Sequence, residues 1–223
     1  MPGRSSPLSG RSAIAEPNTA ADLAEGLSPL ARLALAYAPA SAREHWLTLL
    51  ALDARLEKIV RTAREPMLAQ LKLAWWRDRL SADPAGWPKG EPLLARLAGW
   101  SDPAALVALV ALVDGWEELL GEPPVDAAAF AAGRAAAATA LARELGADGV
   151  GVGPASRAWA FADLVLAGEG LTPEVPPRGL PRAMRPLAVL AGVTLGAARK
   201  GRADALYTPG AWLTAVRIGL FGR

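Results

Sequence analysis

The chain has 223 residues, of which 52% are hydrophobic and 21% are charged, so it has enough apolar material for a core and lacks the composition of a disordered protein. It has no cysteine and one histidine, which excludes disulfides, thiolate metal sites and multi-histidine metal sites, and fits a reducing, cytoplasmic location. The formal net charge is only +2, and basic residues mostly alternate with acidic ones, so we expect no nucleic-acid partner.

The N-terminal segment, residues 1–27, differs from the rest because it is rich in Ser, Pro, Gly and Ala. It lacks the apolar centre of a secretory signal, and we expect a disordered tail. Arg4 and Arg11, with several serines and no acidic residue before Glu16, leave an organellar transit peptide as the alternative. Residues 28–223 are then a single helical domain.

Helix-start signals recur along residues 28–223, as capping side chains or as prolines at the first helical position. They are Ser28-Pro29, Ser41 with Glu44 as a capping box, Pro66, Asp102-Pro103, Asp126 and Pro154. Short linkers rich in Pro and Gly separate the helical segments, and no segment alternates with a period of two. The pattern predicts an all-α bundle of seven to eight helices.

The segment 65–80, EPMLAQLKLAWWRDRL, contains two adjacent tryptophans. At about 100° per residue its apolar side chains divide into two opposite faces, so we expect neighbours on both sides and a central place in the bundle. One face contains Met67, Leu68, Leu71 and Trp75, and the other contains Ala69, Leu73, Trp76 and Leu80. Asp78 lies on the first face, where a buried carboxylate needs a partner, and we expect an arginine from a neighbouring helix. This favours a structural salt bridge for Asp78 over a catalytic role.

The preceding helix, expected over residues 42–63, places Asp53 and Glu57 on one face because they are four residues apart. Such a carboxylate pair can hold Mg²⁺ if a facing helix supplies more oxygen ligands. The alternative is an intrahelical ion pair between Glu57 and Arg61, which the surrounding cations favour. Those cations, Lys58 among them, repel Mg²⁺ but suit a diphosphate.

Two later segments carry charged residues among apolar ones. Asp163 is flanked by Trp159 and other large side chains, and we expect it to face inward. The C-terminal WLTAVRIGLF contains Arg217 and either touches a membrane surface or packs on the bundle, of which packing is favoured. The longest apolar run, residues 104–113, is too short to span a bilayer, so membrane contact is at most peripheral.

A longer pattern resembles the squalene/phytoene synthase superfamily over residues 28–222. Its strongest part is EPMLAQLKLAWWRD, residues 65–78, after the helix LTLLALDARLEKIVRTAR. The segments at 109–146 and 155–181 are similar to the middle and second-motif segments of that family. The second-motif segment ends in an arginine-to-proline run, which Arg178 and Pro181 match. The resemblance implies an isoprenoid-synthase-like fold with a central cavity. It also implies head-to-head condensation of two prenyl diphosphates, with Mg²⁺ bridging them to aspartates on two facing helices.

The chain departs from that family where the aspartates belong. The first motif falls on residues 57–61, where Lys58 and Arg61 replace acidic residues, and the second begins at Asp163 and ends at Ala167. Only Glu57 and Asp163 remain as remnants of a metal site. The departure resembles the branch of the superfamily that contains the assembly factors of respiratory complex I, which lack full aspartate-rich motifs.

The leading hypothesis is therefore a non-catalytic protein that binds an isoprenoid or lipid-like ligand or assists assembly of a membrane complex, peripheral to the inner membrane. The alternative is an active Mg²⁺-dependent prenyltransferase that condenses prenyl diphosphates. In both cases the expected cavity or substrate residues are Asp53, Glu57, Lys58, Arg61, Trp75, Asp78, Trp159 and Asp163.

Overall fold

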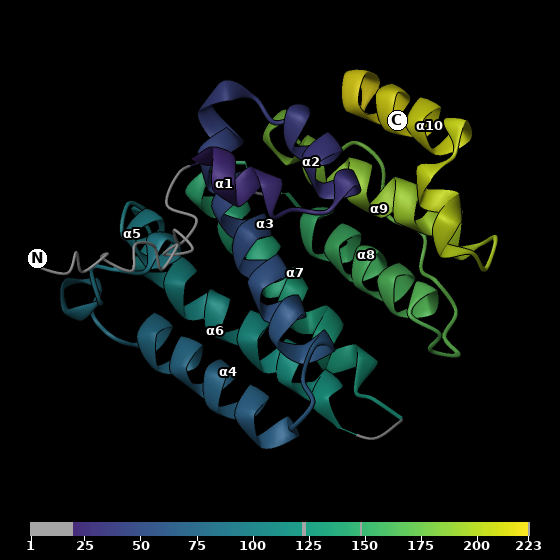
Figure 1. Ribbon diagram of the computed structural model, residues 1–223. Coiled ribbons are helices and arrows are strands. Elements are labelled where there is room, and N and C mark those ends of the chain that lie inside the picture. Colours follow the sequence, from purple (N-terminus) through teal and green to yellow (C-terminus); the bar gives the residue numbers. More distant parts are fainter. Residues whose placement is uncertain (1–19, 122–123, 148, 223) are drawn as a thin grey trace, which may run out of the picture.

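The computed structural model describes residues 20–121, 124–147 and 149–222. These residues contain ten α-helices and no strand, which confirms the all-α class (Figure 1). The helices are α1 (Ala20–Glu25), α2 (Pro29–Ala36), α3 (Ala40–Arg61), α4 (Pro66–Ser81), α5 (Pro92–Leu97), α6 (Pro103–Glu117), α7 (Ala127–Glu144), α8 (Val152–Leu166), α9 (Arg185–Ala198) and α10 (Pro209–Phe221).

The two helices beyond the predicted count, α1 and α5, are six residues long and show too few turns for a periodicity to be read. Both are held by burial of leucines: Leu23 of α1 and Leu27 after it are buried, as are Leu93, Leu94 and Leu97 of α5. Residues 20–27 therefore belong to the helical domain and not to the predicted tail. The rest of that tail, residues 1–19, lies outside the described residues.

The capping signals position most of the helices. The side chains of Ser28, Asp102 and Asp126 each accept a hydrogen bond from a backbone N–H in the first turn, as predicted. The predicted capping box is wrong, because α3 begins at Ala40 and places Ser41 inside its first turn. Glu44 instead forms an ion pair with Arg96 of the α5 helix.

Helices that follow one another in sequence from α6 to α10 also lie side by side in space. Figure 1 shows this row running across the molecule, with α3 crossing α7 and with α4 at the edge beside α6. The helix α3 contacts α1, α2, α4, α5, α6 and α7. It is therefore the element around which the N-terminal half is arranged.

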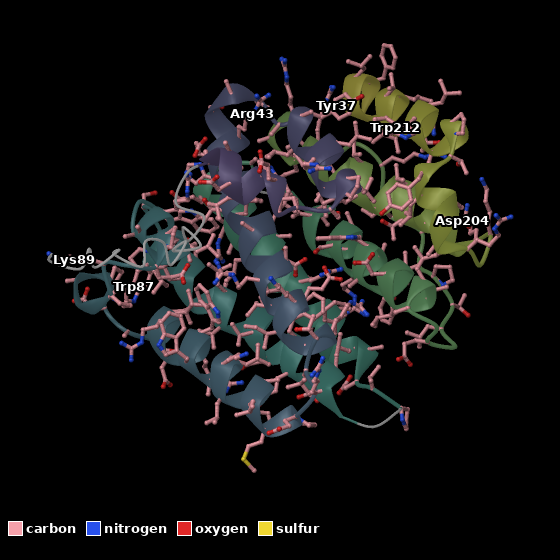
Figure 2. All side chains as sticks on the ribbon, viewed as in Figure 1. Tyr37, Arg43, Trp87, Lys89, Asp204 and Trp212 are labelled. Atoms are coloured by element: carbon pink, nitrogen blue, oxygen red, sulfur yellow. The ribbon has the colours of Figure 1, made fainter. Side chains whose placement is uncertain are left out.

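Glycines allow close approach of helix backbones at the α6–α7 crossing. A Cβ atom added at Gly133 would lie 2.2 Å from the carbonyl oxygen of Ala111, and one added at Gly115 would lie 3.1 Å from the Cα of Phe130. Gly219 of α10 also lacks room for a side chain, because the ring of Tyr37 (labelled in Figure 2) lies against it. These contacts leave no room for a side chain at either crossing.

The tryptophan helix α4 lies at the edge of the bundle, so the predicted central position is wrong. Its face of Ala69, Leu73, Trp76 and Leu80 is buried, mainly against α6. The opposite face is exposed, with 71% of Met67, 51% of Leu68, 62% of Leu71 and 38% of Trp75 accessible to solvent. Asp78 shares that outer face, is exposed, and has no ion-pair partner among the described residues, so the predicted buried salt bridge is also wrong.

A buried carboxylate, Glu144 at the end of α7, joins that helix to the start of α6. It accepts hydrogen bonds from the backbone N–H of Ser101 at 2.8 Å and of Asp102 at 2.9 Å, and from the Ser101 hydroxyl at 3.0 Å. Burial acts to raise the pKa of Glu144, but these hydrogen bonds and nearby His45 outweigh it and lower the pKa below its usual value. The ionised form therefore stabilises the fold.

Two glycine substitutions are expected to change stability in opposite directions. Gly133→Ala should destabilise the protein by about 1–3 kcal/mol, because the helices must separate to admit the methyl group. Gly196→Ala, in α9 and with open space around it, should be neutral or stabilising by up to about 1 kcal/mol, because alanine loses less backbone entropy in a helix. Urea unfolding of both variants measures the difference, and equal effects would contradict the close packing of α6 and α7.

Removal of the Glu144 charge should weaken the fold at neutral pH and not in acid. Because its pKa is lowered on folding, its contribution is present above the unfolded pKa of about 4.3 and is lost as the pH falls through the folded value. Glu144→Gln should therefore cost about 1–2 kcal/mol at pH 7, with the gap from the wild type closing in acid. Urea midpoints measured across this pH range provide the test, and a gap that does not change with pH would contradict the argument.

Candidate functional site

The charged centre of the bundle is Arg134 on α7, whose side chain is 3% exposed. Its Nε and Nη2 donate to the two carboxylate oxygens of Asp53 on α3, at 3.3 and 2.9 Å. Its Nη1 donates to Asp163 on α8. One guanidinium thus connects three helices, and we call these three residues the Arg134 cluster.

Aromatic rings enclose the Arg134 cluster. The guanidinium carbon lies 4.0 Å from the centre of the Trp159 ring, 4.7 Å from that of Phe130 and 5.3 Å from that of Trp116. The Trp116 Nε1–H also donates to Asp53 at 2.8 Å. Ring faces attract a cation more strongly when water is excluded, so they add to the stability of the buried charge.

The ionisation of the cluster follows from its burial and its neighbours. Burial acts to lower the pKa of Arg134, but the charges of Asp53 and Asp163 outweigh it and raise that pKa above its usual value. Burial raises the pKa of Asp163, while its ion pair with Arg134 acts in the opposite direction. Arg134 therefore remains a cation between the two carboxylates.

Glu57 and Arg61 lie next to the cluster and are paired with each other. The Arg61 Nε donates to Glu57 at 2.8 Å, and both side chains are close to half exposed, at 46% and 43%. The intrahelical ion pair is thus confirmed over the alternative of a free carboxylate pair. Their charges still act on the cluster: Glu57 acts to raise the pKa of Arg134, and Arg61 acts to lower the pKa of Asp163.

The side chains of this region do not fit Mg²⁺. A magnesium ion needs several oxygen ligands in octahedral geometry, but the carboxylates of Asp53 and Asp163 are hydrogen-bonded to Arg134. Within residues 20–121, 124–147 and 149–222, no group of three or more acidic or histidine side chains is placed to hold a metal ion. A guanidinium stands between the carboxylates, and it repels a second cation.

A cavity of about 640 Å³ lies on the other side of α3, between α1, α3, α4 and α5. At about 100° per residue, Ala51, Arg55 and Lys58 of α3 face the cavity, whereas Asp53 and Glu57 point to the opposite side. The eight candidate residues are therefore not one site. Lys58 and Trp75 line the cavity. Asp53 and Asp163 belong to the Arg134 cluster, Trp159 covers it, and Glu57 and Arg61 lie beside it. Asp78 is on the outer face of α4.

The cavity combines apolar walls with a cationic rim. The walls include Leu23, Leu27, Ile59, Trp76 and Leu93. The charged side chains that line the cavity are Arg55, which lies 3.7 Å from Glu91, Lys58 and Lys72, together with the carboxylates of Asp22 and Glu91, so cations outnumber carboxylates by three to two. Both lysines are exposed, and neither forms an ion pair with a described residue. This arrangement suits a ligand with an apolar body and an anionic end.

Two parts of these sites escaped the sequence analysis. The cavity walls at Leu23 and Leu93 come from α1 and α5, which are too short to be recognised. Arg134 had a signal that was available: it is the only charged residue of AAAFAAGRAAAATALA, residues 127–142. A charge that is buried in a helix of small apolar residues needs partners, so Arg134 was a candidate for a buried ion pair.

The fold and these sites define an all-α protein with a buried ion-pair cluster and a separate cationic cavity. Comparison of the chain with protein-family models, curated proteins and solved structures gives no match. Among the described helices, none combines the length and apolar character needed to cross a bilayer. The resemblance to the squalene/phytoene synthases thus stays a prediction.

Loss of Arg134 should be far more costly than loss of an exposed arginine on a neighbouring helix. Arg134→Met leaves Asp53 buried without its partner and should destabilise the protein by about 3–5 kcal/mol. Arg61→Met removes a half-exposed pair and should cost less than about 1 kcal/mol. Urea unfolding compares the two, and the double variant Asp53→Asn/Arg134→Met should recover part of the loss. Strict additivity in the double variant would contradict the pairing.

Proposed function

We propose that this chain is a non-catalytic relative of the squalene/phytoene synthases, with an isoprenoid-synthase-like arrangement of helices, that binds a ligand with an apolar tail and an anionic head. The family part of this proposal rests on the sequence resemblance over residues 28–222. The observation that carries the functional part is the Arg134 cluster, in which both inward-facing carboxylates are ion-paired.

The inward-facing carboxylates of Asp53 and Asp163 are not free for catalysis, because both are ion-paired with Arg134. The resemblance implies an enzyme in which aspartates on facing helices hold Mg²⁺ against a diphosphate. In this chain Asp53 accepts two hydrogen bonds from Arg134, and a guanidinium does not give up its proton in proteins. Mg²⁺ binding would require breaking this pair inside the bundle and leaving Arg134 buried without compensation.

The cavity between α1, α3, α4 and α5 is the proposed ligand site. Its volume of about 640 Å³ lies within the range of about 300–1,000 Å³ typical of small-molecule pockets. Its leucine, isoleucine and tryptophan walls favour an isoprenoid or lipid-like chain. Lys58 and Lys72 at the rim favour a phosphate or diphosphate at the end of that chain.

A role in assembling a membrane complex is the second function that the resemblance implies. One observation favours it: the outer face of α4 exposes Met67, Leu68 and Leu71 next to the half-covered Trp75. A contiguous patch of exposed apolar side chains often marks a site of interaction with another protein or a membrane. The two functions are compatible, because Trp75 contributes both to this face and to the cavity.

Farnesyl diphosphate is expected to bind the protein without being converted. Titration calorimetry should detect binding, and an assay for released pyrophosphate should stay at background with and without Mg²⁺. Lys58→Gln/Lys72→Gln should weaken binding about tenfold, because two charge-assisted contacts to the diphosphate are lost.

The matched control is Arg64→Gln/Lys89→Gln, which also removes two positive charges but from exposed positions outside the cavity. It should leave the affinity unchanged. Release of pyrophosphate that depends on Mg²⁺ would overturn the non-catalytic proposal. Equal affinity of the wild type and the Lys58/Lys72 variant would instead remove the cavity as the binding site.

A further inference from the structure

A second, smaller hollow lies between α9, α10 and the segment that precedes α9. Its volume is about 240 Å³, below the range of about 300–1,000 Å³ of pockets that enclose a whole drug-sized ligand. Three arginines line it, Arg178, Arg199 and Arg217, and none of its lining residues is acidic. We call it the arginine pocket, and its size and charge suit a small anionic group.

Within the part of the chain that the structure describes, no carboxylate neutralises the three arginines. All three are exposed, and none of their guanidinium groups forms an ion pair or a hydrogen bond with a described residue. The carboxylates closest in sequence to Arg178 and Arg199 have other partners, since Glu174 pairs with Arg157 and Asp204 pairs with Arg202. Three like charges around one hollow repel one another unless an anion joins them, and a phosphate is the group that guanidinium matches best.

The helix α10 presents an apolar face beside the arginine pocket. Its inner side, with Ala215, Ile218 and Gly219, is buried in the bundle, and Arg185 of α9 donates to the carbonyls of Gly219 and Leu220 at its end. Its outer side exposes Trp212 (48%), Leu213 (71%), Val216 (39%), Leu220 (55%) and Phe221 (68%). The helix contains no acidic residue. Figure 1 shows α10 at the periphery of the molecule.

The pocket and the apolar face can meet the same flat surface. Arg217 lines the pocket and, at about 100° per residue, lies about 40° from Leu213 and about 60° from Leu220 around the helix. Trp212, labelled on α10 in Figure 2, and Phe221 lie at the two sides of this exposed sector. An arginine beside exposed Leu, Trp and Phe side chains can hold its charge at the level of the lipid headgroups while the apolar side chains enter the membrane surface.

A second copy of the chain fits this surface poorly. A symmetric dimer would bring the same patch of both copies together, so three unpaired arginines would face three more. A peptide segment would need a groove, and the outer face of α10 is the exposed side of a single helix. An anionic bilayer, in contrast, supplies phosphates for the arginines and an apolar layer for the leucines.

We propose that α10 and the arginine pocket form a docking surface for anionic phospholipid membranes. Arg178, Arg199 and Arg217 bind lipid phosphate groups, while Leu213, Leu220 and the flanking aromatic rings enter the headgroup region. The surface is separate from the cavity between α1, α3, α4 and α5, so the inference does not depend on what that cavity binds.

The test is co-sedimentation of the full chain with vesicles in about 0.1 M salt. Binding is expected with vesicles of phosphatidylcholine plus one-quarter phosphatidylglycerol and not with phosphatidylcholine alone. Arg199→Gln/Arg217→Gln should weaken binding about 30-fold, the factor that corresponds to about 1 kcal/mol for each basic residue at an anionic membrane surface. The control Arg64→Gln/Lys89→Gln has the same net charge as Arg199→Gln/Arg217→Gln and should bind like the wild type.

A second variant tests the apolar half of the surface. Leu213→Ser/Leu220→Ser changes two exposed side chains, so the fold is preserved, and it should lower vesicle binding at least tenfold. Equal binding of the two charge variants, or equal binding to both vesicle types, would overturn the proposal. The proposal would also be overturned if the protein failed to bind anionic vesicles but bound glycerol phosphate in calorimetry. That result would mark the pocket as a site for a soluble anion.

Discussion

The interaction on which the structure depends most is the hydrogen-bonded ion pair of Arg134 with Asp53 and Asp163. It joins α7 to α3 and α8 in the middle of the bundle, and rings from α6, α7 and α8 enclose it. The three side chains must stay in contact, because a buried charge without its partners costs several kcal/mol. The three helices must therefore be placed so that one guanidinium reaches two carboxylates, and this constrains the orientation of each.

Close packing of α6 and α7 makes that placement possible. Gly115 and Gly133 let the two helices approach until a methyl group no longer fits between them. Arg134 follows Gly133 directly, so the same close approach holds its side chain deep in the bundle, beside Trp116. The alanines of α7 contribute in the same way, because small side chains let neighbouring helices share a narrow space.

The Arg134 cluster and the cavity lie on opposite faces of α3. Since the inward carboxylates are used in ion pairs, the face of α3 that carries Asp53 is closed to a ligand. The opposite face of α3 borders a cavity whose rim lysines lack partners among the described residues. The buried ion pairs and the cavity thus lie on two sides of one helix. The edge helices α4 and α10 add exposed apolar faces, which are the surfaces available for a partner or a membrane.

The sequence by itself determined the all-α class, most helix starts and the Glu57–Arg61 pair, because capping, helix propensity and four-residue spacing act within a few residues of chain. It did not determine which apolar face of α4 is buried, and it placed Asp78 inside when it lies outside. Periodicity shows that a helix has two apolar faces, but only the tertiary arrangement decides whether both are covered. The partners of Arg134 come from residues 81 and 29 positions away, and such long-range contacts leave no local pattern.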